Sequence, residues 1–239
     1  MTAEIISVGT ELLLGNILNT NAQYLSRELA ALGITVQRES TIGDNHDRLA
    51  DFVNEAKQRC DLLVFTGGLG PTADDLTKET VAGCYGDTLA FDPEEWQKIV
   101  DFFTRTGRKT TPNNRKQAMV PVNGHKITNN HGTAPGAWFE QDGHCAVLMP
   151  GVPHEMKAMW EESVRPLLLA RQNCTAFHHA AGAGRRKRYR IPCAASAGKR
   201  KSHRRNLLQD RRVRDPHYCP GRNRQFSRKN VPRIRHKVL

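Results

Sequence analysis

The sequence lacks the features that mark a secreted, membrane-spanning or zinc-stabilised protein. Its six cysteines form no C-x-x-C pair, which argues against a zinc site and against a disulfide framework. No run of residues approaches the ~18 apolar residues that a membrane-spanning helix needs. The N-terminal residues MTAEIISV contain neither the basic region nor the long apolar region of a secretory signal peptide. We therefore expect a cytoplasmic protein.

Acidic residues are scarce in only one part of the chain. Residues 1–172 carry 16 Lys and Arg and 22 Asp and Glu. Residues 173–239 carry 20 Lys and Arg but only 2 Asp and Glu. Only ten of the 67 residues in the second segment are Leu, Ile, Val or Phe, which is below the ~20% that a hydrophobic core usually needs. These differences predict a folded domain over residues 1–172 and a disordered basic tail over residues 173–239. Taken literally, a tail of this charge is a nucleic-acid-binding arm, but we do not expect it to bind nucleic acid.

The folded segment alternates short apolar runs with amphipathic stretches. Apolar runs at residues 5–8, 34–40 and 62–65 predict strands, and the stretches from Thr20 and Asn45 predict helices between them. This order predicts a parallel sheet with helices on both faces. Further along, we expect helices over residues 93–106 and 112–118 and from His154, and a β-hairpin region of short strands between residues 121 and 149.

One stretch, TGGLGPTADDLT at residues 66–77, carries most of the chemical signal. It follows a buried strand and precedes helix-compatible sequence, so free N–H groups and the positive end of a helix dipole would converge there. Glycine lets a backbone approach a phosphate without a Cβ in the way. The carboxylates of Asp74 and Asp75 would repel a phosphate, so the pair indicates a divalent cation between protein and ligand.

Two other interpretations of this stretch stay open. Gly68, Gly70 and Ala73 match the G-x-G-x-x-A pattern of dinucleotide-binding folds. Pro71 and the acidic pair argue against that pattern. The other interpretation is a tight strand-to-helix turn in which Asp74 caps the helix and nothing binds.

Polar residues also follow the other predicted strands. Thr10 and Glu11 follow the first strand, and Asp44 follows the second. Ligands of open α/β sheets bind beyond the carboxyl ends of the strands, so these side chains should meet the glycine stretch at one rim. A second glycine turn, residues 151–155, ends in Glu155, which is either a site residue or a first-turn acid that stabilises the helix dipole. The cationic side chains within residues 114–116 either contact a phosphate or lie on a solvent-exposed helix face.

Taken together, these segments resemble a known family. The chain contains in order GTELLLG (9–15), NTN (19–21), GDN (43–45), TGGLGPTADDLT (66–77), NRKQA (114–118) and MPGVPHEM (149–156). They are similar to the N-terminal domain of the competence- and damage-inducible protein A (CinA) family. That domain is in turn similar to the MoaB/Mog-type molybdopterin-binding domains of molybdenum cofactor biosynthesis. The resemblance covers about residues 1–175.

The resemblance implies a fold, a reaction and partners. The fold is an α/β three-layer sandwich around a mostly parallel sheet, which forms a homodimer and binds a nucleotide or pterin phosphate. The reaction is metal-dependent hydrolysis of the pyrophosphate in ADP-ribose-like nucleotides, with Mg²⁺, Mn²⁺ or Co²⁺ as cofactor. The alternatives are a domain that binds molybdopterin or transfers adenylyl groups to it, and a non-enzymatic partner in competence or DNA damage.

We assign the site by combining the resemblance with the strand-end argument. Asp44, Asp74 and Asp75 are the predicted catalytic and metal-binding carboxylates. A phosphate would be held by the amides of Gly67, Gly68 and Gly70 and the hydroxyls of Thr66 and Thr72. The full predicted substrate-binding set is Thr10, Glu11, Thr66, Gly67, Gly68, Leu69, Gly70, Thr72, Thr77, Gly151, Pro153 and Glu155.

After Thr175 the sequence departs from the family's pattern. Globular sequence is expected there, whereas this chain continues with Arg-rich sequence that has no helical or strand periodicity, including RRKR at residues 185–188. We hypothesise that the tail is read out of frame and that the chain is a truncated member of the family. A shift of frame near codons 175–185 that restores no apolar-periodic sequence would refute this hypothesis.

Overall fold

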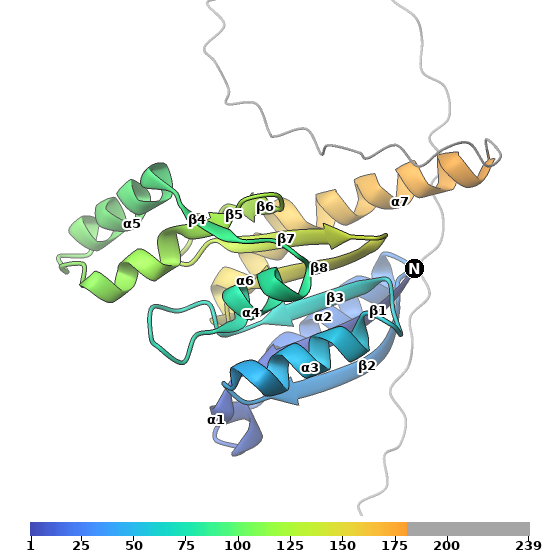
Figure 1. Ribbon diagram of the computed structural model, residues 1–239, viewed down its shortest axis with the longest axis horizontal. Coiled ribbons are helices and arrows are strands. Elements are labelled where there is room, and N and C mark those ends of the chain that lie inside the picture. The colour runs from blue at the N-terminus through green and yellow to red at the C-terminus, as the bar shows by residue number, and fades with distance from the viewer. Residues whose placement is uncertain (181–239) are drawn as a thin grey trace, which may run out of the picture. The chain divides into compact units, whose positions relative to one another are not determined.

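The computed structural model describes residues 1–180, with the side chains of residues 1–172. Six strands form one sheet in the order β2-β1-β3-β8-β7-β6, and β4 pairs with β5 in a separate sheet (Figure 1). The strands are β1 (Thr2–Val8), β2 (Thr35–Ile42), β3 (Leu62–Thr66), β4 (Leu89–Phe91), β5 (Met119–Pro121), β6 (His125–Ile127), β7 (Gly136–Gln141) and β8 (His144–Met149). The helices are α1 (Thr10–Leu13), α2 (Thr20–Ala31), α3 (His46–Ala56), α4 (Thr77–Cys84), α5 (Pro93–Arg105), the 3₁₀ helix η1 (Pro112–Ala118), α6 (Pro153–Met159), the π-helical turn η2 (Trp160–Val164) and α7 (Arg165–Ala180).

The large sheet is parallel over four strands and antiparallel at one side. β2, β1, β3 and β8 run parallel, while β7 and β6 are antiparallel additions. β3 is buried along its whole length, as expected for a short apolar run in the middle of a parallel sheet. Helices α3 and α4 cover one face, and α2 and α6 cover the other (Figure 1). The predicted three-layer α/β sandwich around a mostly parallel sheet is therefore confirmed.

Local capping signals explain where several helices begin. The side chain of Asn45 accepts from the N–H of Arg48 and caps α3, and the side chain of Asp92 accepts from the N–H groups of Glu94 and Glu95 and caps α5. Both helices start where the sequence predicted. In α2 the capping residue is Asn19, whose side chain accepts from the N–H of Ala22. The helix starts at Thr20, as predicted, and Asn is among the residues preferred as an N-cap.

The structure also contains elements that the sequence did not predict. Residues 10–13 form the short helix α1, and the three-residue strands β4 and β5 pair to form a small sheet beside α5 and η1. The last helix passes through the π-helical turn η2 and continues as α7 to Ala180. It thus crosses residue 172, where we placed the domain boundary, and that boundary stays a prediction.

The predicted disordered basic tail begins within this last helix and lies mainly outside the described residues. Within the part of the chain that the structure describes, no helix is both long enough and apolar enough to cross a membrane.

Candidate functional site

A cleft of about 650 Å³ opens beyond the carboxyl ends of β1, β3 and β8. Its walls come from the segments that follow these three strands, from Asp44 after β2, and from the start of α2. Parallel strands bring their carboxyl ends to the same edge of a sheet, which is why segments far apart in the sequence meet here. All of the predicted site residues line this cleft except Thr10 and Thr77.

The glycine loop after β3 needs its first two glycines for steric reasons. Gly67 and Gly68 adopt φ values of 103° and 66°, in the left-handed region that disfavours other residues. A Cβ on Gly67 would lie 2.1 Å from the carbonyl oxygen of Val8, and one on Gly68 would lie 2.0 Å from the hydroxyl of Thr77. The loop is therefore packed tightly between the end of β1 and the start of α4.

This packing changes which groups can hold a phosphate. The N–H of Gly67 donates to the carbonyl of Met149 at 3.1 Å, and the buried hydroxyl of Thr66 donates to the carbonyl of Pro150 at 3.0 Å. The hydroxyl of Thr72 donates to the carboxylate of Asp75. These three predicted phosphate ligands are thus already engaged by the protein. Among the described residues the N–H groups of Gly68, Leu69 and Gly70 make no hydrogen bond, so they stay available to a ligand.

Two of the predicted site residues, Thr10 and Thr77, do not line the cleft but hold segments that do. The N–H and the hydroxyl of Thr10 donate to the carboxylate of Asp44 at 3.0 and 2.9 Å, which ties the start of α1 to the end of β2. Thr77 is fully buried, and its N–H donates to the carbonyl of Gly68 at 3.2 Å. Both residues therefore position parts of the cleft without lining it.

The three predicted metal-binding carboxylates differ in their surroundings. Asp44 accepts from Thr10, and Asp75 accepts from the N–H of Thr72 at 2.8 Å. The side chain of Asp74 is exposed and makes no hydrogen bond or ion pair within the described residues. In the described part of the chain no three His, Cys, Asp or Glu side chains are close enough to hold a metal ion by themselves. The residues fit only a cation that takes its remaining ligands from water and substrate phosphates, as Mg²⁺ commonly does. The metal site stays a prediction.

The charge of the cleft is strongly one-sided. Five carboxylates line it, and no Lys, Arg or His is among the described residues that do so. An anionic ligand would therefore meet repulsion unless a cation accompanies it or a cationic side chain reaches the cleft from outside. The acidic lining residues are Glu11, Asp44, Asp74, Asp75 and Glu155.

Glu155 is held in a defined orientation at the start of α6. The side-chain amide of Asn129 donates to its carboxylate at 2.7 Å, and the backbone at Gly132 packs so closely that a Cβ there would lie 1.9 Å from it. The loop before β7 thus fixes the orientation of a carboxylate that lines the cleft. Glu155 lies in the first turn of α6 and also lines the cleft, so both interpretations stay open.

Sequence reasoning missed Asn21, which organises two of the strand ends. Its side-chain amide donates to the hydroxyl of Thr66 at 2.9 Å and to the carbonyl of Gly151 at 2.8 Å. A signal for it was present, because Asn21 belongs to the NTN segment (19–21) that is among those resembling the family. Asn19, Gln117 and Thr133 also line the cleft and were not assigned to it.

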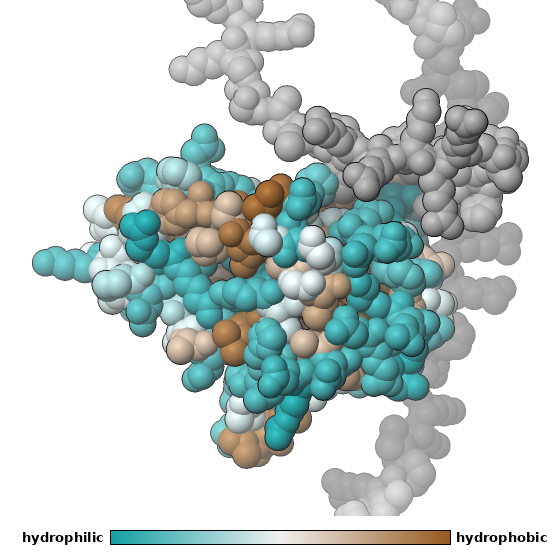
Figure 2. All heavy atoms as spheres, viewed as in Figure 1, coloured by the Kyte–Doolittle hydropathy of each residue, from teal (hydrophilic) through white to brown (hydrophobic). Residues whose placement is uncertain are grey.

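One lip of the cleft is apolar. Leu13, Leu14, Ile17 and Leu18 are all more than half exposed, and hydrophobic surface gathers over α1 and the turn that follows it at the lower edge of the molecule (Figure 2). Ile17 and Leu18 line the cleft itself. The cleft thus combines an acidic floor with an apolar lip.

Comparisons with known proteins agree with this arrangement. A family model described as "Probable molybdopterin binding domain" matches residues 4–170. A competence-damage inducible protein of Clostridioides difficile is 51% identical over 168 residues, which cover 70% of this chain and 40% of that protein. One from Bacillus cereus is likewise 51% identical over 168 residues, covering 41% of its length. The crystal structure of the protein CinA from Thermoplasma acidophilum, described as having unknown function, matches with a TM-score of 0.62 and 35% identity, covering 69% of this chain and 96% of that one.

The match covers the described fold and stops short of the tail. The chain spans about two fifths of the length of the curated relatives that it matches. The family model matches residues 4–170, a range that includes the glycine loop and all of the residues that line the cleft. The chain therefore belongs to the CinA family, and its residues 4–170 match the family model of a probable molybdopterin-binding domain.

Proposed function

We propose that the cleft hydrolyses the pyrophosphate bond of ADP-ribose-like nucleotides with the help of a divalent cation, Mg²⁺, Mn²⁺ or Co²⁺. Water adds to one phosphorus atom, the P–O–P bridge breaks, and the products are AMP and ribose 5-phosphate. The observation that carries this proposal is the combination of free loop amides with five carboxylates and no cationic side chain among the described lining residues. That combination suits a phosphate which arrives with its own cation.

The chain's own groups have distinct roles in this proposal. The N–H groups of Gly68, Leu69 and Gly70 bind phosphate oxygens and stabilise the charge that develops on them. Asp74 and Asp75 would hold the cation. The cation, when bound, neutralises the phosphoanhydride oxygens and lowers the pKa of a water molecule. Glu11 and Glu155 are the carboxylates left to accept a proton from the attacking water.

Turnover of ADP-ribose by the full chain tests the proposal. AMP release is measured with each of the three cations and with EDTA, for the unaltered chain and for Asp74→Asn. Because the side chain of Asp74 makes no hydrogen bond or ion pair within the described residues, the variant should fold normally. It should lose at least about 100-fold in kcat/KM, since the cation supplies several kcal/mol of transition-state stabilisation. Asp51→Asn, at an exposed position on α3 away from the cleft, is the matched control.

A second candidate function is binding of molybdopterin or adenylyl transfer to it. The description of the matching family model favours it. It uses the same glycine loop but requires a pterin phosphate, so ATP consumption would depend on that second substrate. Absence of AMP release from ADP-ribose with all three cations would exclude the hydrolase and leave this candidate. The predicted homodimer stays a prediction.

A further inference from the structure

The acidic cleft raises the question of which cationic side chain of this chain reaches a bound phosphate. Arg115 and Lys116 lie next to each other in the last turn of η1, and the sequence left open whether this pair faces a phosphate or solvent. The structure separates the two residues. The guanidinium of Arg115 stacks over the rings of Phe91 and Trp96, 4.5 and 5.9 Å from their centroids. Arg115 is therefore occupied on the side of η1 that faces α5.

Lys116 points the other way, toward the glycine loop. Its ammonium lies 3.3 Å from the carbonyl oxygen of Thr72, and Thr72 is part of the cleft wall. Its other contact is an ion pair with Glu79 at 3.5 Å. Both distances exceed the ~2.7–2.9 Å of a strong charge-assisted hydrogen bond. The ammonium is thus held next to the loop by weak contacts and keeps donor capacity for a further acceptor.

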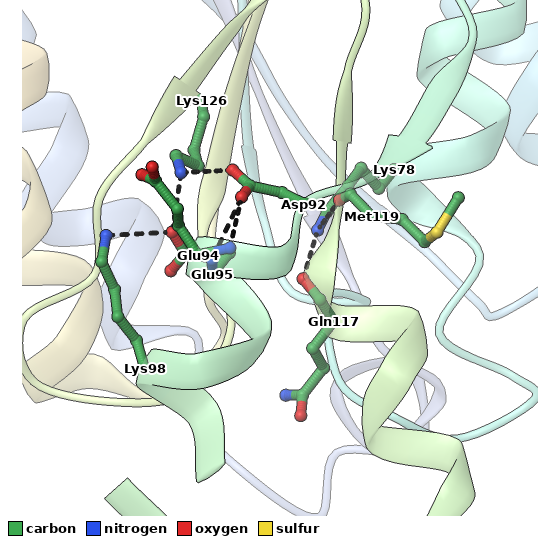
Figure 3. Close-up of polar contacts among 8 residues, drawn as sticks. All are labelled: Lys78, Asp92, Glu94, Glu95, Lys98, Gln117, Met119 and Lys126. Carbon is green, nitrogen blue, oxygen red and sulfur yellow. Dashed lines mark hydrogen bonds and ion pairs between the residues drawn. The ribbon is translucent and has the colours of Figure 1, made fainter. Parts of the chain in front are cut away.

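The backbone that carries Lys116 is firmly anchored. The ammonium of Lys78, a residue only 4% exposed, donates to the carbonyls of Gln117 and Met119 at 3.4 and 3.0 Å (Figure 3). These carbonyls end η1, where a cation interacts favourably with the helix dipole. Since Lys78 belongs to the first turn of α4, this bond fastens the end of η1 to the helix that follows the glycine loop.

Further contacts fix the start of α5 and the end of η1. Lys126 pairs with Asp92 at 2.6 Å and with Glu95 at 2.9 Å, which fixes the start of α5 (Figure 3). The side-chain amide of Gln117 donates to the hydroxyl of Thr133 at 3.0 Å on the opposite cleft wall. The backbone of η1 is thus anchored, while the flexible side chain of Lys116 can still adjust when a ligand enters.

We propose that Lys116 is a substrate-binding residue, whose ammonium leaves Glu79 and donates to an oxygen of the phosphate held by the amides of Gly68 and Gly70. The ligand class is a phosphate or pyrophosphate ester. This inference rests on the proposed function, since it assumes that a phosphate occupies the glycine loop. It assigns to η1 a direct cationic contact with the substrate, which no lining residue of the described part of the chain supplies.

A rival explanation is that Lys116 only neutralises Glu79. One carboxylate oxygen of Glu79 is buried without a hydrogen-bond partner among the described residues, so loss of Lys116 by itself carries a stability cost. The two explanations differ in what Glu79→Gln does. If Lys116 serves only the ion pair, Glu79→Gln and Lys116→Met break the same contact, and both should change nucleotide binding to the same extent. If Lys116 binds the substrate, Glu79→Gln releases it and binding of a nucleotide should not weaken.

The experiment measures binding of ADP with Mg²⁺ to the full chain by calorimetry. Lys116→Met should bind about tenfold more weakly, as expected for loss of one charge-assisted hydrogen bond. Lys116→Arg should restore most of the affinity, Glu79→Gln should bind at least as tightly as the unaltered chain, and Arg115→Met is the unaffected neighbour. Equal weakening in Lys116→Met and Glu79→Gln would overturn the inference. No ADP binding by the unaltered chain would instead overturn the proposed function on which it rests.

Discussion

Replacing Gly68 by alanine tests how tightly the glycine loop is built. The φ of 66° at this residue costs a residue with a Cβ about 1–2 kcal/mol. The added Cβ would also lie 2.0 Å from the hydroxyl of Thr77, and forced overpacking of this kind costs about 1–3 kcal/mol. The two effects together predict that Gly68→Ala lowers the free energy of unfolding by about 2–5 kcal/mol.

The matched control is Gly33→Ala. Gly33 has a φ of 71°, close to that of Gly68, but a Cβ there would have nothing within 4 Å. It therefore carries only the backbone cost, about 1–2 kcal/mol. Urea unfolding followed by near-ultraviolet circular dichroism of Trp138 and Trp160, both buried, gives the two free energies. The difference between the variants isolates the steric contact with Thr77.

A second substitution identifies the contact itself. Thr77→Ala removes the hydroxyl, which is buried without a hydrogen-bond partner in the described part of the chain, so the single variant should cost little. The next atoms around a Cβ on Gly68 are the Cβ of Thr77 at 3.1 Å and a methyl of Val8 at 3.3 Å. The double variant should therefore recover about 1 kcal/mol or more of the loss. The inference of tight loop packing is wrong if Gly68→Ala lowers the free energy of unfolding no more than Gly33→Ala does. It is also wrong if the double variant regains none of the lost free energy.

Two further predictions concern buried polar groups. Asn21→Ala removes both side-chain donations that join α2 to Thr66 and Gly151, and it should lower the free energy of unfolding by about 1–3 kcal/mol, measured by the same urea titration; an unchanged value would mean that the two strand ends hold without it. Burial lowers the pKa of the Lys78 ammonium from its ordinary 10.5 to about 8, so between these values the unfolded chain binds a proton that the folded chain does not. Stability should therefore rise from pH 8 toward pH 10, by about 2 kcal/mol relative to Lys78→Met, and parallel stability curves for the two proteins would contradict this.

Local signals made much of the fold predictable. Asn45 and Asp92 mark helix starts through their side-chain caps, and the short apolar run before the glycine loop forms the buried strand β3. The meeting of strand ends was predictable for the same reason, because it follows from parallel pairing alone. These features depend on neighbouring residues or on a general property of parallel sheets.

The remainder depended on pairings between distant segments. β4 and β5 are three residues long and join residues 89–91 to 119–121, a contact with no periodic signal of its own. The bond from the N–H of Gly67 to Met149 exists only because β3 pairs with β8. That pairing engages the N–H of Gly67, one of the donors that the glycine pattern suggests, in a bond that the sequence alone did not reveal.

The packing that removes these donors also prepares the site. Thr66, Gly67 and Thr72 are bonded within the protein, and this fixes the backbone of the loop before any ligand arrives. Fewer amides are then left without a hydrogen bond, but those that remain lose little conformational entropy when a phosphate binds. Electrostatic stabilisation is strongest when donors need no reorganisation. In the proposed function, the loop amides bind the phosphate, while a cation and the side chain of Lys116 supply the positive charge that the described lining residues lack.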